Sequence, residues 1–240
     1  YDRLRNIPDL DRTSRLSAYL HYGHVSTHQV FARLAESENW HSGRLSLKPT
    51  GKRSGWWGMS VAAEAFVDEL VTWRELGYSF CRQRPDYAEY EGLPDWARAT
   101  LEQHAGDERP YLYSYEQFRA ATTHDPLWNA AQRQLLQEGR IHGYLRMLWG
   151  KKILEWSPSP REALEIMLDL NDRFALDGQD PNSYSGISWC LGRFDRAWGP
   201  ERSIFGKIRY MTSQNTARKV AVKRYIARYA AEKQQGELDL

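Results

Sequence analysis

The pattern of apolar and polar residues predicts helices along most of the 240-residue chain. Apolar side chains recur every three or four residues, and Gly, Pro, Ser or Asp residues bound the segments with this spacing. No stretch alternates in the manner of a β-strand. We therefore expect an all-α fold, with helices over residues 15–23, 27–35, 62–81, 95–104, 126–137, 141–156, 161–170 and 217–230.

Two stretches lack this periodicity. Residues 38–60 are polar, contain several glycines and carry the adjacent Trp56 and Trp57, so we predict a long loop with exposed indoles. Residues 177–188 contain Gly178, Pro181 and Gly186 among polar side chains and are predicted to be irregular. Loops of such length inside a compact domain are usually functional or mobile.

Composition favours a folded globular protein, because 41% of the residues are hydrophobic and the chain has ten Trp and fourteen Tyr residues. Cys81 and Cys190 are too few for a disulfide framework, which suggests a reducing compartment or two buried thiols. No apolar run is long enough to span a membrane. We predict a monomer with a single domain over residues 1–240. Because the chain starts at Tyr1, we expect it to be a piece of a longer protein.

The net charge of +2 is unevenly distributed. Residues 202–231 contain eight Lys or Arg residues and no Asp or Glu, and residues 39–63 contain only the cations Arg44, Lys48, Lys52 and Arg53. Such an excess suits a polyanion, because neutralised phosphates release their counterions. Charge alone is equally compatible with an ordinary solvated basic face.

Several common chemistries lack their motifs. There is no G-x-G-x-x-G fingerprint or G-x-S-x-G elbow, and Gly51-Lys52 has Ser46 where a P-loop needs its first glycine. His24 and His28 have the spacing of one helical face, but no glutamate follows the first histidine as in a metalloprotease. We therefore expect no metal site.

The remaining motifs combine aromatic and polar residues. The segments THDPLWNAAQ (123–132) and IHGYLRMLWGKKILEW (141–156) resemble class II cyclobutane pyrimidine dimer photolyases, of the photolyase and cryptochrome family. YDRLRN (1–6), SRLSAYLHYG (14–23), LNDRFALDGQDPN (170–182) and FGKIRYM (205–211) resemble the same family in the same order. The resemblance implies the helical FAD-binding domain. The family's N-terminal α/β antenna domain is absent from this sequence, so no antenna chromophore can be assigned.

Two tryptophans of this region have a spacing that suits electron transfer. On an ideal helix Trp149 and Trp156 lie on nearly the same face, about 10.5 Å apart along the axis, which is short enough for electron hopping to a buried flavin. The resemblance adds Trp128 as a third member of the relay. Tryptophans at helical spacing are otherwise usually core residues.

The resemblance also implies a set of flavin contacts. Asn171 would lie against the flavin N5, although its residue type is equally suited to a helix-end cap or a satisfied polar group. Arg146 and Asp177 would pair beside the isoalloxazine, with Asp180 at the same edge. The groups expected at the diphosphate, the ribityl chain and nearby positions are Thr13, Ser14, Arg15, Leu16, Ser17, Tyr1 and Arg5.

A further set would hold two linked pyrimidines flipped out of DNA. Flipping costs a few kcal/mol, and stacking on an aromatic ring returns about 1–3 kcal/mol per base. By resemblance, Trp73 and Trp189 would form the walls for the dimer, and Glu69 would hydrogen-bond a pyrimidine. Met147 would provide apolar contact, and Arg196 and Trp198 would fill the gap left in the duplex. Taken singly, each suits core packing or a surface ion pair. Lys151 and Lys152 are expected at the surface or facing phosphate.

The leading hypothesis is a cytoplasmic enzyme, nucleoid-associated if bacterial, that uses light and FAD to split pyrimidine dimers in UV-damaged DNA. One alternative is a cryptochrome-like FAD photoreceptor without repair activity. A second is a flavin-free helical module that binds nucleic acid through the basic segment. The 38–60 loop is longer than the family pattern leads us to expect, and it would either contact DNA or shield the flavin.

Overall fold

The computed structural model describes residues 1–48 and 50–231, and the regular secondary structure within them is helical apart from one isolated bridge between Arg202 and Gly206. This confirms the predicted all-α class. The predicted domain also includes residues 49 and 232–240, which lie outside the described residues. The α-helices are α1 (Ser17–His21), α2 (Thr27–Ser37), α3 (Val61–Val67), α4 (Arg74–Gln83), α5 (Asp95–Gln103), α6 (Tyr115–Arg119), α7 (Pro126–Glu138), α8 (Gly143–Trp156), α9 (Pro160–Phe174), α10 (Pro181–Cys190), α11 (Ser213–Lys219) and α12 (Lys223–Arg228). Short 3₁₀ turns occur at η1 (Pro8–Leu10), η2 (Ser42–Arg44) and η4 (Tyr90–Gly92).

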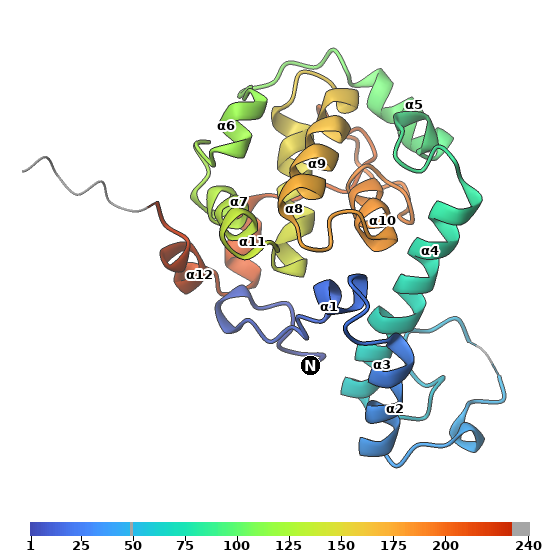
Figure 1. Cartoon of the computed structure of the whole chain (residues 1–240). Coiled ribbons are helices and arrows are strands. Elements are labelled where there is room, and N and C mark those ends of the chain that lie inside the picture. The colour runs from blue at the N-terminus through green and yellow to red at the C-terminus, as the bar shows by residue number, and fades with distance from the viewer. Residues whose placement is uncertain (49, 232–240) are drawn as a thin grey trace, which may run out of the picture.

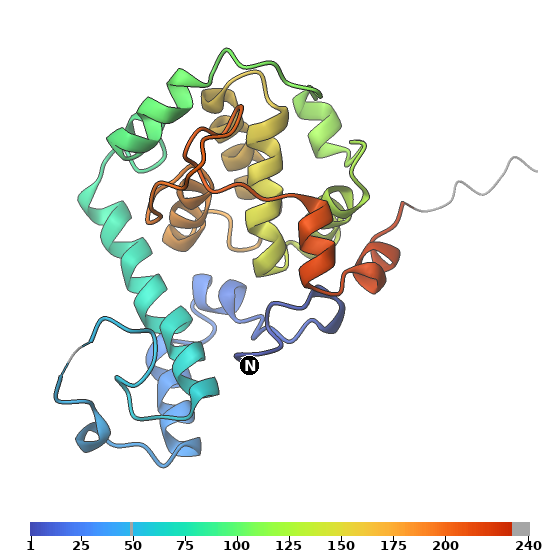
Figure 2. The same ribbon diagram turned by 180° about the vertical axis from the view of Figure 1, so that it is seen from behind.

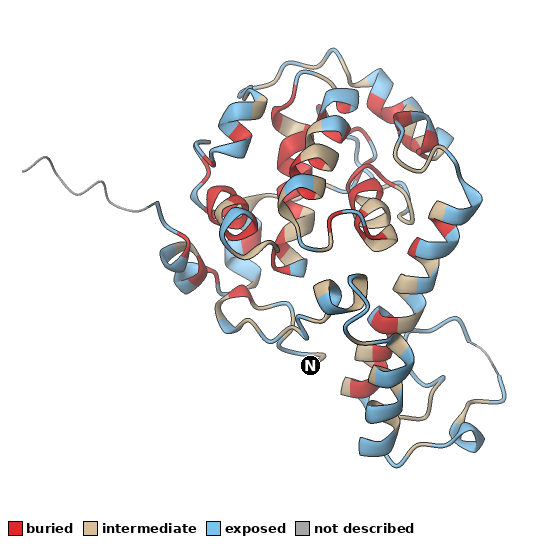
Figure 3. Cartoon of the chain, viewed as in Figure 1, coloured by how far each residue is buried: buried red, intermediate tan, exposed pale blue. Residues whose placement is uncertain are grey.

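Helices α8 and α9 lie at the centre of a rounded body, with the segments that carry α4, α5, α6 and α7 around them (Figures 1 and 2). The loop over residues 38–60, α2 and α3 extend from the lower end of this body in Figure 1. Buried residues concentrate on α7, α8, α9 and α10, whereas α2 has none (Figure 3). The helices pack closely: a Cβ atom on Gly150 of α8 would lie 2.5 Å from Sγ of Cys190 on α10. Among the described residues, no helix is both long and apolar enough to cross a membrane.

The helix predicted over residues 62–81 is confirmed, with one added feature. Helix α3 continues into a π-helical turn, η3 (Asp68–Trp73), and then into α4. A π turn accommodates an extra residue within a helix and is frequent at functional sites. The sequence pattern gave no sign of this change in winding.

Three local predictions were wrong or missed. Residues 177–188 were expected to be irregular, but most of them form α10, because Pro181 suits the first helical position and the Asp180 side chain accepts from the Asn182 N–H at 2.9 Å. The short α6 was missed, although Ser114 and Gln117 form a capping box there.

The helix predicted over residues 217–230 is instead interrupted between α11 and α12. Val220 has extended dihedral angles, and the carbonyl of Ala221 accepts a hydrogen bond from the N–H of Asp9 at 3.2 Å. Val222 is buried at the same point. The backbone between α11 and α12 therefore bonds to the distant N-terminal segment, and the helix does not continue through this point.

Candidate functional site

A cavity of about 290 Å³ lies beside α1, α3, the π turn η3, α4 and α10. Its lining combines residues predicted to contact a cofactor with residues predicted to contact a lesion. The lining residues are Tyr1, Ser14, Leu16, Ser17, Leu20, Phe66, Glu69, Leu70, Trp73, Arg74, Asn182, Ser185, Gly186, Trp189 and Phe194. Segments far apart in the sequence thus contribute to one site.

Two predicted residues at the cavity are joined by an ion pair. The Arg5 guanidinium donates to the Glu69 carboxylate, and its Cζ lies 5.4 Å from the ring centroid of Tyr1. Burial alone would lower the pKa of Arg5, but the hydrogen bond and charge of Glu69 outweigh it, so that the pKa is raised. Burial also raises the pKa of the Tyr1 phenol. Glu69 is therefore held at the cavity wall by an N-terminal residue.

The two indoles predicted to flank a pyrimidine dimer lie against each other. The ring centroids of Trp73 and Trp189 are 4.6 Å apart and their planes differ by 26°. The indole N–H of Trp73 donates to Asp68 Oδ2 at 3.2 Å. This separation leaves no room for a base between the two rings. The two indoles therefore do not stand apart as walls on either side of a dimer, and they form a stacked patch on the cavity wall.

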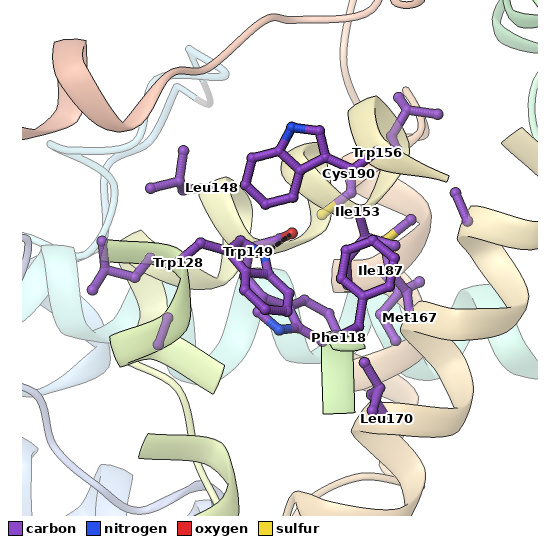
Figure 4. Packing of buried hydrophobic residues seen from close by; sticks show 14 of the residues in the cluster. Phe118, Trp128, Leu148, Trp149, Ile153, Trp156, Met167, Leu170, Ile187 and Cys190 are labelled. Carbon is purple, nitrogen blue, oxygen red and sulfur yellow. Dashed lines mark hydrogen bonds between the residues drawn. The ribbon is translucent and has the colours of Figure 1, made fainter. Parts of the chain in front are cut away.

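The tryptophans predicted to carry electrons form one buried cluster (Figure 4). Trp128, Trp149 and Trp156 are only 0%, 2% and 1% exposed. The rings of Trp128 and Trp156 have centroids 5.9 Å apart, and Trp128 Nε1 donates to the carbonyl of Trp149 at 3.0 Å. Trp149 Nε1 donates to Gln132 Oε1 at 2.8 Å. The geometry brings all three residues together, but none reaches solvent.

Sequence reasoning missed the aromatic residues that cover Trp156. The rings of His124 and Tyr113 lie 5.0 Å and 5.6 Å from that of Trp156, and Tyr111 stacks on His124 at 3.8 Å. Tyr111 is 48% exposed, so contacting aromatic rings connect Trp156 with the surface. The sequence YLY (111–113) is the only local signal for this arrangement.

Asn171 and Asp177 lie on either side of the turn that follows α9. Asn171 is buried, and its Nδ2 donates to the carbonyl of Gly178 at 2.9 Å. Arg146 Nη2 approaches Asp177 Oδ1 to 3.5 Å, so the predicted pair forms. This Asp177 oxygen is buried and has no hydrogen bond within the described residues, and such an atom could accept one from a ligand.

Asp180, the third acidic residue predicted at the flavin edge, is already engaged by protein groups. It caps α10, and its Oδ2 lies 3.3 Å from His21 Nδ1 and 3.7 Å from Arg74 Nη1. None of Asn171, Arg146, Asp177 and Asp180 lines the cavity.

The predicted turn over residues 13–17 divides into two parts. Ser14, Leu16 and Ser17 line the cavity, whereas Thr13 donates to Asp11 Oδ1 at 3.3 Å and Arg15 pairs with the same carboxylate. Thr13 and Arg15 therefore support the turn from behind.

The remaining predicted lesion residues are separate from the cavity lining. Met147 packs against the core. Trp198 donates to Asp195 Oδ1 at 3.1 Å, and the guanidinium carbons of Arg196 and Arg209 lie 4.3 Å and 4.2 Å from its ring centroid. Arg209 was not predicted at this cluster.

The prediction for the two adjacent lysines was wrong, because both are buried. Lys151 donates to the carbonyl of Cys190, and burial lowers its pKa to about 8. Lys152 pairs with Glu155, and its Nζ lies 5.2 Å from the ring centroid of Trp156. Both lysines belong to the packing around α8, where the sequence pattern suggested only charge.

Parts of the basic segment over residues 202–231 are neutralised by acids from outside it. Lys207 pairs with Glu201 at 3.2 Å, and Arg228 pairs with Glu138 at 2.9 Å. In the described part of the chain, no group of three or more His, Cys, Asp or Glu residues is placed to hold a metal ion. His24 precedes α2, so it does not share a helical face with His28 as its spacing suggested.

Comparison with known proteins identifies clear relatives. No model of a known protein family matches the chain. The chain is 47% identical over 219 residues to a deoxyribodipyrimidine photo-lyase of Potorous tridactylus, covering 91% of this chain and 38% of the relative. It is 40% identical over 228 residues to a protein of the same name from Methanothermobacter thermautotrophicus, covering 95% of this chain and 46% of the relative.

The solved structures give the same picture of the fold. A bacterial class III photolyase from Agrobacterium tumefaciens matches 95% of this chain with a TM-score of 0.64, at 18% identity and over 40% of its own length. This match supports the helical fold alone. The chain spans less than half the length of the two sequence relatives described above.

Proposed function

Because the chain belongs to the photolyase family, we propose that it binds FAD and uses light to split cyclobutane pyrimidine dimers in DNA. The observation that carries the proposal is the shared cavity. Tyr1, Ser14 and Ser17, expected at the cofactor, line the same space as Glu69 and Trp73, expected at the lesion. A cofactor and a lesion bound there would be close enough to react.

Several features suit a flavin. The cavity has apolar walls from Leu16, Leu20 and Phe66 beside the hydroxyl groups of Ser14 and Ser17, a mixture suited to a ring system with a polar chain. In the turn after α9, Oδ1 of Asp177 faces Arg146 at 3.5 Å and is buried without a hydrogen bond within the described residues, so it could accept one from a polar group of the cofactor. When bound, photoexcited reduced FAD would supply an electron to the dimer and recover it after the ring splits. Asn171 and the pair of Arg146 with Asp177 lie outside this lining, so we assign them to the isoalloxazine by family resemblance alone.

The buried indoles would serve to keep this cofactor reduced. Trp128 contacts the ring of Trp156 and donates its indole N–H to the carbonyl of Trp149, and the burial of all three residues excludes water. The ring stack of His124 and Tyr111 continues from Trp156 to the surface. We propose that electrons from outside enter through these aromatic residues.

The lesion would bind at the stacked indoles. Flipping a damaged base pair costs a few kcal/mol, and stacking on one aromatic ring returns about 1–3 kcal/mol per base. Because the two rings are stacked 4.6 Å apart, Trp73 and Trp189 would need to separate to admit the dimer, or the dimer would stack on the outer face of the pair. Glu69, held by Arg5, would accept a hydrogen bond from a pyrimidine N–H.

The closed indole pair also favours a second candidate, a photoreceptor that binds FAD without repairing DNA. A stack at 4.6 Å with no space for a base is what a protein without a lesion substrate would retain. The two candidates share the cofactor and the electron relay, and they differ only in their action on DNA.

A repair assay separates the candidates. The purified chain is loaded with FAD, reduced chemically and illuminated with blue light in the presence of an oligonucleotide that contains one dimer. Light-dependent loss of the dimer supports the proposal, and a dark sample is the control. A chain that binds and photoreduces FAD but leaves the dimer intact supports the photoreceptor. A colourless protein that cannot take up FAD, yet binds DNA, supports a flavin-free nucleic-acid-binding module.

A further inference from the structure

The loop that separates α2 from α3 is fixed at its base by two carboxylates. Glu64, buried in α3, accepts the backbone N–H groups of Gly58 at 2.8 Å and Met59 at 3.3 Å. Glu38 accepts the N–H and the hydroxyl of Ser60 at 2.8 Å and 2.7 Å. The two acids that border the loop are thus bonded to groups of the loop itself, and in the part of the chain that the structure describes neither forms an ion pair with Lys52 or Arg53.

Aromatic packing holds the loop against α2. The ring centroid of Phe31 lies 5.4 Å from those of both Trp40 and Trp57, and Trp40 Nε1 donates to the carbonyl of Trp57 at 2.6 Å. Gly58 has a φ of +66°, and a Cβ atom there would lie 2.3 Å from the carbonyl oxygen of Arg44. The base of the loop therefore has a defined path, which directs the residues between these anchor points.

Positive charge on the loop is available for a ligand. Lys52 and Arg53 are exposed, and neither forms an ion pair within residues 1–48 and 50–231. Arg44 differs, because it donates to the carbonyl of Glu38 at 2.9 Å and so belongs to the loop framework. Trp56, three residues after Arg53, is 37% exposed. Exposed cations beside an exposed indole form a surface that suits nucleic acid.

The charged part of the loop reaches the edge of the cavity. The guanidinium carbon of Arg53 lies 5.9 Å from the ring centroid of Trp73, the indole that lines the cavity and stacks on Trp189. The loop therefore contacts a residue of the cavity lining, although α3 separates the two in the sequence.

We infer that this loop is a DNA-contact arm, in which Lys52 and Arg53 bind backbone phosphates of the strand next to the lesion. The inference rests on the proposed function, since it takes the cavity as the place of the lesion. Binding would draw Arg53 from the face of Trp73 toward a phosphate, which exposes the indole when DNA arrives. Exchange of a cation–π contact for a charge-assisted hydrogen bond makes this movement favourable.

The test is a binding titration in the dark with the full chain and a fluorescent duplex that contains one dimer, repeated at several salt concentrations. The variants are Lys52→Gln and Arg53→Gln. The matched control is Arg82→Gln, which removes an exposed cation of α4 that likewise forms no ion pair among the described residues. Each loop variant is expected to reduce the slope of log affinity against log salt by about 0.9, the value for one lost phosphate contact, whereas the control keeps the wild-type slope.

Wild-type slopes in both loop variants would overturn the inference. Lys52→Gln guards against a trivial effect of Arg53→Gln on the indole pair, because Arg53 and not Lys52 forms the cation–π contact with Trp73 among the described residues. Repair under light is measured on the same samples. If the loop variants lower the salt slope but the wild-type chain repairs no dimer, the DNA-contact arm is supported and the proposed repair activity is refuted. If the wild-type chain repairs the dimer but the loop variants keep the wild-type slope, the repair activity is supported and the arm is refuted.

Discussion

Replacement of Trp149 by phenylalanine should separate the packing role of the indole from its electron-transfer role. Trp149 Nε1 donates to Gln132 Oε1 at 2.8 Å, and both side chains are buried. Phenylalanine removes the donor and leaves this acceptor unsatisfied, which costs about 1–3 kcal/mol. Trp156 has no indole hydrogen bond within the described residues, so Trp156→Phe deletes the same ring atoms without this penalty. Trp149→Phe should therefore unfold at a lower denaturant concentration than Trp156→Phe.

Denaturant titration measures that difference, and the double variant Trp149→Phe with Gln132→Met should recover most of it, because replacing both partners by apolar groups is nearly neutral. Both single variants should photoreduce the flavin slowly under blue light. Repair should persist in both when the flavin is reduced chemically beforehand. Equal stability of the two variants would refute the hydrogen-bond argument. Equal loss of photoreduction and repair would show that these residues only support the fold.

Three further predictions concern stability. Burial lowers the pKa of Lys151 from 10.5 to about 8, so as pH rises the folded state releases this proton before the unfolded state does. The free energy of unfolding of the wild type, relative to that of Lys151→Met, should therefore increase between about pH 8 and pH 10.5. Paired denaturant titrations measure this difference. Burial alone would raise the pKa of Asp11, but Arg140 at 2.8 Å and Arg15 lower it overall. Asp11→Asn should lower the free energy of unfolding by about 1.5–3 kcal/mol at pH 7. This stability difference from wild type should shrink as the pH falls through the lowered pKa of Asp11. Gly150→Ala should cost about 1–3 kcal/mol through overpacking against α10, whereas Gly143→Ala, with open space around it, should not lower the thermal midpoint.

Sequence periodicity predicted most of the helices because their apolar faces pack on a shared core. The exceptions depend on other information. Helix α10 starts from a side-chain cap at Asp180 and packs on α4 so tightly that a Cβ atom on Gly77 would lie 2.8 Å from Asn182 Oδ1. The break near Val222 depends on the N-terminal segment. At α10 a local side-chain cap starts a helix where the apolar spacing is absent, and near Val222 a distant backbone contact interrupts a helix that the apolar spacing predicts.

The candidate site shows the same division. Sequence and resemblance named some of the residues that line the cavity and the three tryptophans of the indole cluster, but not their partners. Periodicity could not show that Arg5 pairs with Glu69 across 64 positions, or that His124 covers Trp156. Lys151 carried a misleading signal, because a charged residue on an otherwise apolar helix is usually exposed, whereas here a carbonyl of the neighbouring helix satisfies its ammonium group.

The π turn carries two residues that line the cavity and contact different parts of the chain. Glu69 and Trp73 are four residues apart, and in a regular α-helix they would be advanced by about 400°, close to the same direction. The turn η3 takes more residues per revolution, which reduces this rotation toward a full turn, and both side chains line the cavity. Glu69 pairs with Arg5 of the N-terminal segment, while Trp73 stacks on Trp189 of α10. Helix α4, after this turn, packs on α10, and α3, before it, carries Phe66 against Tyr1. The turn therefore joins the part of the helix beside Tyr1, expected at the cofactor, to the part beside Trp189, expected at the lesion. If the indoles separate to admit a base, the movement would involve η3, which also carries Glu69, the partner of Arg5.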